Sequence, residues 1–385
     1  MIRRNRQFTF RTFLMGLAIV AGLHAETPGD AWPAFRGDAA LTGVAGTTLP
    51  GNLELLWAVT VGEGIESTPA IVGGFVFVTT LDSTLAALRL TDGTTAWRYE
   101  ASHEIKSSPA VHGGMVYFGD EGGRFHAVDA ATGERRWHYD TGAGIVSTAN
   151  VVGDRVVFGS YDQFLYCLAS ADGDSLWSLE TEGYINASPA IAGGMVIITG
   201  CDGFLRQVDL VTGTERRAIR LDDYIAASPA VAGGRAYVGT FGNQVMAVDL
   251  DTGGVAWRYE HPRRQFPYYA SPAIAGGIVV VAGRNKLVQA LSAESGEALW
   301  SWSTRARIDA SPVIVGDAVV AGDESGRLAV LDLADGSERW QTEIGADLIG
   351  SPAVAYRRIV VGATDGTVFC FGAKDDRLTI PPVVR

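Results

Sequence analysis

The chain has 385 residues, a net charge of −12 at neutral pH and three cysteines. Such an acidic chain repels phosphate backbones, which argues against nucleic acid as a partner. The odd cysteine count (Cys167, Cys201 and Cys370) favours buried free thiols over a disulfide framework, so stability must come from an apolar core that the 47% hydrophobic composition can supply.

The first 25 residues differ from the rest of the chain. Four arginines precede an apolar run from Phe13 to Leu23, and Ala25 provides a cleavage site before Glu26. The run is too short for a spanning helix, which needs roughly 20 residues, so we expect a cleaved export signal over residues 1–25 and no transmembrane span afterwards. Removing four basic and no acidic residues would bring the net charge to −16. No cysteine follows the run as a lipid attachment point, so a periplasmic or secreted protein is expected.

A repeat of about 40 residues runs through the remaining chain and predicts one cooperative domain. A tryptophan marks the end of each unit, with an arginine in one slot: Trp57, Trp97, Trp137, Trp177, Arg217, Trp257, Trp300 and Trp340. A Ser-Pro or Thr-Pro pair opens each unit, with an alanine in one slot: Pro69, Pro109, Ala149, Pro189, Pro229, Pro272, Pro312 and Pro352. We expect a leader over residues 26–53, the repeats over 54–372 and a tail over 373–385.

Each unit predicts four short strands. In residues 108–139, β-prone runs at 109–111, 115–118, 124–128 and 136–139 are separated by glycine-rich turns. One such antiparallel meander, with strands A to D, cannot cover its own apolar faces, whereas a closed ring of them can. Eight markers and eight tryptophan slots therefore predict an all-β, eight-bladed propeller, in which the tryptophans pack in the core.

The two series of markers are out of phase. Trp57 precedes the first Ser/Thr-Pro pair, and the last unit ends at Phe371 without a tryptophan. We expect the strand around residues 56–59 to supply strand D of the last blade, which pairs an open edge and joins the two ends of the ring.

The units at 127–137 (AVDAATGERRW), 247–257 (AVDLDTGGVAW) and 330–340 (VLDLADGSERW) resemble the pyrroloquinoline-quinone-type propeller repeat. The leader from Trp32 to Gly43 also resembles the segment that precedes such propellers. This resemblance implies the propeller fold, and it covers both quinoprotein dehydrogenases and non-catalytic proteins similar to the outer-membrane protein assembly factor BamB. Adjacent cysteines and long inserts, both typical of the dehydrogenases, are missing here, so the resemblance favours the BamB-like group.

The sequence predicts no catalytic residue and no metal site. It has no Gly-x-Ser-x-Gly elbow, His-Glu-x-x-His motif or phosphate loop. Its histidines beyond the export signal show no ligand spacing: His103, His112, His126, His138 and His261. The aspartates at 129, 209, 249 and 332 recur four residues before a glycine, which indicates that they hold turns.

A candidate ligand site lies at the predicted channel mouth. The residue three positions before each Pro marker varies from unit to unit, although the apolar residue before it repeats. Because this position would face the channel, its polar members are candidate ligand residues: Glu66, Lys106, Asn186, Tyr269 and Asp309. A mouth lined only by solvated polar groups is the alternative.

A second candidate surface follows from a three-residue insertion in the loop 261–267. We expect this loop to gather basic and aromatic side chains with two neighbouring loops, and we name the set the basic lobe: Arg263, Arg264, Phe266, Arg284, Lys286, Arg305 and Arg307. The same face is otherwise expected to be acidic, with Asp82, Asp120, Glu121, Asp162, Asp202, Asp222, Asp223, Asp323 and Asp365. Arginine and aromatic residues favour interface centres, so the lobe predicts a partner or anionic-ligand surface; scattered solvated charge is the alternative.

Together these features favour an exported, monomeric scaffold that presents loops to an envelope protein partner and needs no cofactor. Two alternatives stay open. A quinoprotein alcohol or sugar dehydrogenase would need pyrroloquinoline quinone and calcium in the channel, with Glu66, Asn186 and Asp309 as the available metal ligands. The third interpretation is recognition of glycans by the channel mouth.

Overall fold

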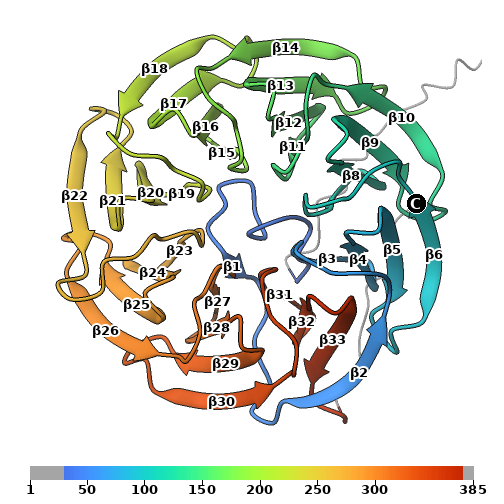
Figure 1. Ribbon diagram of the computed structural model, residues 1–385, viewed down its shortest axis with the longest axis vertical. Helices are drawn as coiled ribbons and strands as arrows, with labels where there is room; N and C mark the ends of the chain where they lie inside the picture. Colours follow the sequence, from blue (N-terminus) through green and yellow to red (C-terminus); the bar gives the residue numbers. More distant parts are fainter. Residues whose placement is uncertain (1–29, 376–385) are drawn as a thin grey trace, which may run out of the picture.

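The computed structural model describes residues 30–375, whose strands form eight antiparallel sheets around a central channel (Figure 1). No helix occurs in this range. The predicted all-β, eight-bladed propeller is confirmed. The expected export signal and the end of the expected tail lie outside the described residues.

Blades 1 to 4 follow one another along the chain. Blade 1 contains β3 (Ala70–Val72), β4 (Phe75–Thr79), β5 (Thr84–Arg89) and β6 (Thr95–Glu100). Blade 2 contains β7 (Ala110–His112), β8 (Met115–Gly119), β9 (Arg124–Asp129) and β10 (Arg135–Asp140). Blade 3 contains β11 (Asn150–Val152), β12 (Arg155–Gly159), β13 (Phe164–Ala169) and β14 (Ser175–Glu180). Blade 4 contains β15 (Ala190–Ala192), β16 (Met195–Thr199), β17 (Phe204–Asp209) and β18 (Glu215–Arg220).

Blades 5 to 7 repeat the pattern, and blade 8 draws on both ends of the chain. Blade 5 contains β19 (Ala230–Ala232), β20 (Arg235–Gly239), β21 (Gln244–Asp249) and β22 (Val255–Glu260). Blade 6 contains β23 (Ala273–Ala275), β24 (Ile278–Gly283), β25 (Leu287–Ser292) and β26 (Ala298–Ser303). Blade 7 contains β27 (Val313–Val315), β28 (Ala318–Gly322), β29 (Arg327–Asp332) and β30 (Glu338–Glu343). Blade 8 contains β31 (Ala353–Ala355), β32 (Arg358–Gly362), β33 (Thr367–Gly372) and β2 (Glu54–Thr60).

The ring closes as the sequence predicts. Strand β2 pairs antiparallel with β33, and Trp57 lies opposite Cys370. This pairing gives the last blade its outer strand and leaves no unpaired edge at the join. Cys370 and Cys167 are buried, and all three cysteines are free.

The repeated tryptophans tie neighbouring blades together. Seven indole N–H groups donate to a backbone carbonyl of the next blade at 2.8–3.1 Å, for example Trp97 to Ala130 and Trp340 to Leu53. All of these rings except that of Trp340 also pack on a turn glycine of the next blade, as Trp97 does on Gly133. A Cβ on that glycine would overlap the indole ring. The tryptophans are therefore structural.

Blade 4 replaces this contact with a different residue. Arg217 holds its tryptophan slot, and Gln207, directly opposite on β17, donates from Nε2 to the carbonyl of Leu250 at 2.7 Å. The inter-blade hydrogen bond is therefore kept although the indole is missing.

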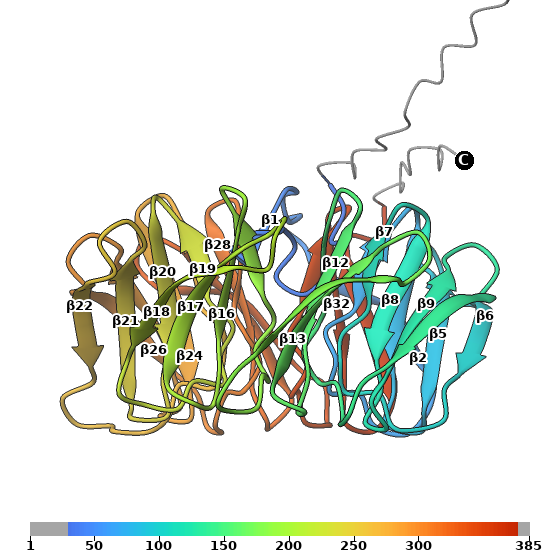
Figure 2. The same cartoon turned by 90° about the horizontal axis from the view of Figure 1, so that it is seen from above.

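Residues 30–45 of the leader lie inside the ring and contact every blade, which the sequence did not predict. Figure 1 shows this segment within the channel, and Figure 2 shows it near one of the two flat faces of the ring. We call this face the leader face. The leader contains the short strand β1 (Val44–Ala45), which pairs in parallel with β27. Its carbonyls accept hydrogen bonds from all eight blades: Asp30 from Tyr356, Trp32 from Ile71, Pro33 from Val111, Ala39 from the Asn150 side chain and from Ile191, Ala40 from Val231, Thr42 from Ile274, and Gly43 from Ile314.

Arg36 anchors the leader at the centre of the channel. Its Nη2 donates to the carbonyls of Pro272 at 2.9 Å and Pro312 at 2.7 Å, and the side chain is fully buried. Burial lowers the pKa of this guanidinium to about 9, because the charged form loses its hydration. Gly43 has a φ of +69° and lies so close to Arg36 that a Cβ would overlap the guanidinium.

Candidate functional site

The site begins with the hydroxyl residues of the Ser/Thr-Pro markers. They form a belt around the channel that we call the hydroxyl ring: Thr68, Ser108, Thr148, Ser188, Ser228, Ser271, Ser311 and Ser351. Seven of the eight links around this belt are hydrogen bonds of 2.8–3.2 Å, in which the backbone N–H of one member donates to the hydroxyl oxygen of the next. The repeated hydroxyl therefore joins neighbouring A strands.

A cavity of about 410 Å³ lies within this belt, and we call it the cup. The walls of the cup are formed by two kinds of loop. One kind connects strand D of a blade to strand A of the next blade, and the other connects strands B and C within a blade. These connections share one face, which we call the loop face; Ile105 of one, for example, donates to Thr80 of the other at 3.3 Å. Phe35 of the leader also lines the cup. The five candidate mouth residues all line this one cavity: Glu66, Lys106, Asn186, Tyr269 and Asp309.

Most polar groups of the cup wall are paired with each other. The Lys106 ammonium lies 3.3 Å from Glu121. The Arg284 guanidinium donates two hydrogen bonds to Asp309, at 2.8 and 2.7 Å. The carboxylate of Glu66 has no ion-pair partner among residues 30–375.

Two tyrosines add ring surface to the wall. The Tyr161 hydroxyl donates to Asn186 Oδ1 at 3.2 Å. Arg284 stacks its guanidinium 4.8 Å from the centre of the Tyr269 ring. Burial raises the pKa of Tyr161 to about 12, so this phenol stays protonated at neutral pH. The sequence missed Tyr161, because it lies in a B to C turn and not at the varied mouth position.

The basic lobe is less cationic than its sequence indicates, because three of its arginines have acidic partners. Arg284 turns into the cup to bind Asp309, Arg307 lies 2.5 Å from Glu324, and Arg305 lies 3.9 Å from Glu343. Burial raises the pKa of Glu324, while Arg307 opposes that rise.

The loop 261–267 and the turn that contains Lys286 carry the part of the lobe that has no acidic partner within residues 30–375. Arg263, Arg264 and Lys286 are exposed and form no ion pair within residues 30–375. Arg264 donates to the carbonyl of Asn285 at 3.2 Å, and the Phe266 side chain is 52% exposed. These four side chains are the accessible core of the lobe.

The acidic residues of the loop face are not a uniform solvated surface. Asp120 and Asp323 are buried, and the side chain of Asp202 is only 4% exposed. They hold turns: Asp323 accepts from the backbone N–H groups of Ser325 and Arg327. The expected acidic surface is therefore wrong for these three residues, because a turn carboxylate and a surface carboxylate look alike in sequence.

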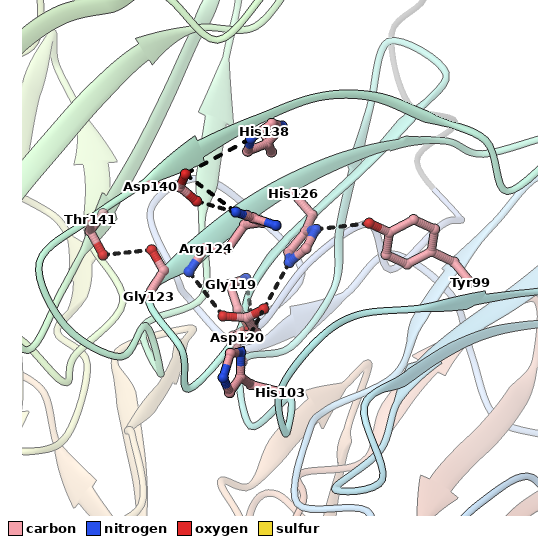
Figure 3. A network of polar contacts seen from close by, with 11 residues as sticks. Tyr99, His103, Gly119, Asp120, Gly123, Arg124, His126, His138, Asp140 and Thr141 are labelled. Carbon is pink, nitrogen blue, oxygen red and sulfur yellow. Dashed lines mark hydrogen bonds and ion pairs between the residues drawn. The ribbon is translucent and has the colours of Figure 1, made fainter.

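A chain of polar contacts links blades 1 and 2 next to this face (Figure 3). His126 lies between Tyr99 and Asp120, with 3.0 Å from Nδ1 to the Tyr99 hydroxyl and 3.0 Å from Nε2 to Asp120. A neutral imidazole satisfies both contacts when Nε2–H donates to the carboxylate and Tyr99 donates to Nδ1. Burial lowers the pKa of His126, and its hydrogen bond to Asp120 only partly offsets that effect.

Comparison with known proteins places the chain in a family. The family model described as outer membrane protein assembly factor BamB matches residues 52–148, 140–216 and 216–380, which together span the whole ring. The chain belongs to this BamB family. The predicted resemblance is thereby confirmed. No curated protein matches the chain.

Solved structures show the same architecture in proteins of different activity. BamB from Moraxella catarrhalis has a TM-score of 0.71 and 21% identity, over 85% of this chain and 99% of that one. Quinohemoprotein alcohol dehydrogenase from Comamonas testosteroni has a TM-score of 0.76 and 14% identity, over 92% and 82%. The computationally designed Ika8 protein has a TM-score of 0.75 and 18% identity, over 83% and 100%. Identities this low show the fold alone.

The residues of the cup do not fit a calcium-bound quinone. Calcium needs about six to eight oxygen ligands that converge on one point. Glu66, Asn186 and Asp309 precede the A strands of blades 1, 4 and 7, and the last two are engaged by Tyr161 and Arg284. Within residues 30–375, no three His, Cys, Asp or Glu side chains are grouped so that they could hold a metal ion.

The described part of the chain also contains no helix that is long and apolar enough to cross a membrane.

Proposed function

We propose that this BamB-family propeller is an exported, non-catalytic scaffold of the cell envelope that docks a partner protein through its loop face. Outer-membrane protein assembly, the process in the family's description, is the process in which this docking would act. Export is inferred from the basic and apolar segment at residues 1–25.

One observation carries the proposal. On a protein of net charge −12, a three-residue insertion places Phe266, Arg263 and Arg264 on the surface beside Lys286. Within residues 30–375, no acidic side chain forms an ion pair with these basic groups. Nothing in the fold requires these side chains, since the other blades close without them. Exposed aromatic and arginine residues that lie together are typical of the centre of a protein interface.

The test is a lobe variant that combines Arg263→Glu, Arg264→Glu, Lys286→Glu and Phe266→Ala. The matched control is Arg258→Glu on β22, an exposed arginine of blade 5 outside the lobe. Site-specific cross-linking in the native envelope should join wild type and control to the same protein, and the lobe variant should lose at least about nine-tenths of that product. Outer-membrane protein levels in a deletion strain should be restored by wild type and control only.

Equal cross-linking and equal restoration by the lobe variant, at unchanged thermal stability, would reject this docking surface. Titration of the purified protein with pyrroloquinoline quinone and calcium tests the dehydrogenase alternative, which the arrangement of the cup residues disfavours. Saturable quinone absorbance changes with dye-linked alcohol oxidation would replace the scaffold proposal.

A further inference from the structure

We propose that the cup binds a neutral oligosaccharide, whose oxygens meet the hydroxyl ring and whose sugar faces stack on Tyr161 and Tyr269. This site is separate from the docking role of the basic lobe. Its volume of about 410 Å³ lies within the range of roughly 300–1,000 Å³ that small-molecule sites occupy.

The hydroxyl ring supplies hydrogen-bond donors that have no acceptor within residues 30–375. Seven of its oxygens accept a hydrogen bond from a backbone N–H of the neighbouring blade. In these seven residues one acceptor position of the hydroxyl oxygen is therefore occupied. Within residues 30–375, none of the eight hydroxyls donates a hydrogen bond to a protein atom. These residues are only 2–5% exposed, and all eight line the cup. A ligand here must therefore be rich in acceptor oxygens.

The charges of the wall select against a strongly charged ligand. Lys106 is neutralised by Glu121, and Arg284 is neutralised by Asp309 in a two-bond pair. A polyanion would have to break these pairs, and it would also meet the unpaired carboxylate of Glu66. A neutral ligand leaves both pairs intact, and one of its hydroxyls can donate to Glu66.

Two aromatic pairs lie at the wall of the cup, and Arg284 covers one face of the Tyr269 ring, so a sugar would use the other face. Tyr161 packs against Tyr184 with their ring centres 5.5 Å apart, and Phe241 packs edge-on against Tyr269 at 5.6 Å. The outer ring of each pair therefore holds the inner ring in place at the cavity. An aromatic face suits a ligand that alternates apolar C–H faces with polar edges, as a pyranose does.

A peptide fits this arrangement less well. Each peptide unit has an N–H group, which can only donate a hydrogen bond. The free hydrogen-bonding groups of the hydroxyl ring are donors as well, so the two do not pair. A sugar hydroxyl can rotate to accept from the ring. The combination of unused donors, internally paired charges and supported tyrosine rings thus favours a carbohydrate.

The experiment titrates the full-length exported protein with maltotetraose, cellotetraose, chitotetraose and laminaritetraose by calorimetry. At least one should bind at a single site with a dissociation constant of roughly 10 μM to 1 mM. Tyr161→Ala and Tyr269→Ala should each weaken binding about ten-fold or more, whereas Tyr161→Phe, which keeps the ring, should lose less.

Tyr224→Ala is the matched control, because Tyr224 is a 65% exposed tyrosine of the same face that does not line the cup. Its affinity should equal that of wild type, and thermal unfolding checks that every variant is folded. Tetraglycine and inorganic phosphate test the competing ligand classes. The proposal is overturned if no oligosaccharide binds at about 10 mM, if either competing probe binds the cup instead, or if binding survives both tyrosine-to-alanine changes.

Discussion

The leader face and the loop face use the same eight blades in opposite ways. On the leader side, the backbone N–H of the middle A-strand residue donates a hydrogen bond to a leader carbonyl in six of the blades. In blade 3 the Asn150 side chain makes this contact, and in blade 8 the backbone N–H of Tyr356 makes it. On the loop side, the mouth position holds eight different residue types. Residues that repeat build the ring, and residues that vary are free to form a site.

The largest loss of stability should come from removing the leader, which fills the channel, together with β2, which completes blade 8. Deleting residues 26–60 takes away the leader and β2, which leaves β33 as an unpaired edge. We expect the cooperative unfolding transition to disappear, measured by circular dichroism on heating. Deleting only residues 26–45 keeps β2 and should lower the transition temperature without abolishing the transition. A sharp transition in the longer deletion would contradict closure by β2.

The tryptophan contacts should come next. Trp97→Ala removes a ring packed on Gly133 and a hydrogen bond to Ala130, so we expect a loss of about 3–5 kcal/mol in the free energy of unfolding. In blade 4, Gln207→Ala removes only the hydrogen bond to Leu250 and should cost about 1 kcal/mol. Urea denaturation measures both; equal losses would show that Gln207 does not stand in for the indole.

A pair of glycines compares the two faces directly. Gly43 in the leader and Gly345 on the loop face both have positive φ, at +69° and +86°, but only Gly43 has neighbours within reach of a Cβ. Gly345→Ala should cost about 1 kcal/mol from backbone strain. Gly43→Ala adds overlap with Arg36 and should cost about 3 kcal/mol. Similar urea midpoints for the two variants would mean that the leader is not tightly packed.

The fold could be predicted from the sequence because the blades repeat the same pattern of residues. The spacing of the tryptophans and of the Ser/Thr-Pro markers gives the blade count, and the phase shift between Trp57 and Pro69 gives the closure. The mouth position was found because it varies within a repeating frame. Its five polar residues do line one cavity, although their role as a site stays a prediction.

Features that occur once could not be predicted in this way. The leader has no repeat to show which blade each carbonyl contacts, so its place in the channel was missed. Pairing across loops was missed for the same reason: nothing in the sequence couples Arg284 to Asp309, 25 positions apart. Tyr161 belongs to a turn whose residues vary for structural as well as functional reasons.

The smallest effect should be the contribution of His126 in blade 2 to the pH dependence of stability. Burial lowers the pKa of His126 below the value of about 6.5 for an unfolded histidine. The unfolded chain therefore binds this proton first as the pH falls, and the stability present above pH 6.5 is lost progressively below it.

Asp120 acts at lower pH. Burial alone would raise the pKa of this carboxyl, but the hydrogen bonds from His126 and the Arg124 N–H outweigh it and leave the pKa below 3.8. Its contribution is lost only as the pH falls below that value. The interval between about pH 7 and pH 5 thus includes the contribution of His126 together with those of His112 and His261, whose pKa values burial also lowers.

His126→Gln tests this assignment, because glutamine keeps a polar partner for Asp120 and does not titrate. We expect urea midpoints measured at about pH 7.5 and about pH 5 to differ less in the variant than in wild type. His138→Gln, an exposed histidine of the same blade, is the control and should retain the wild-type difference. If both variants behave alike, the chain of Tyr99, His126 and Asp120 does not set the pH response.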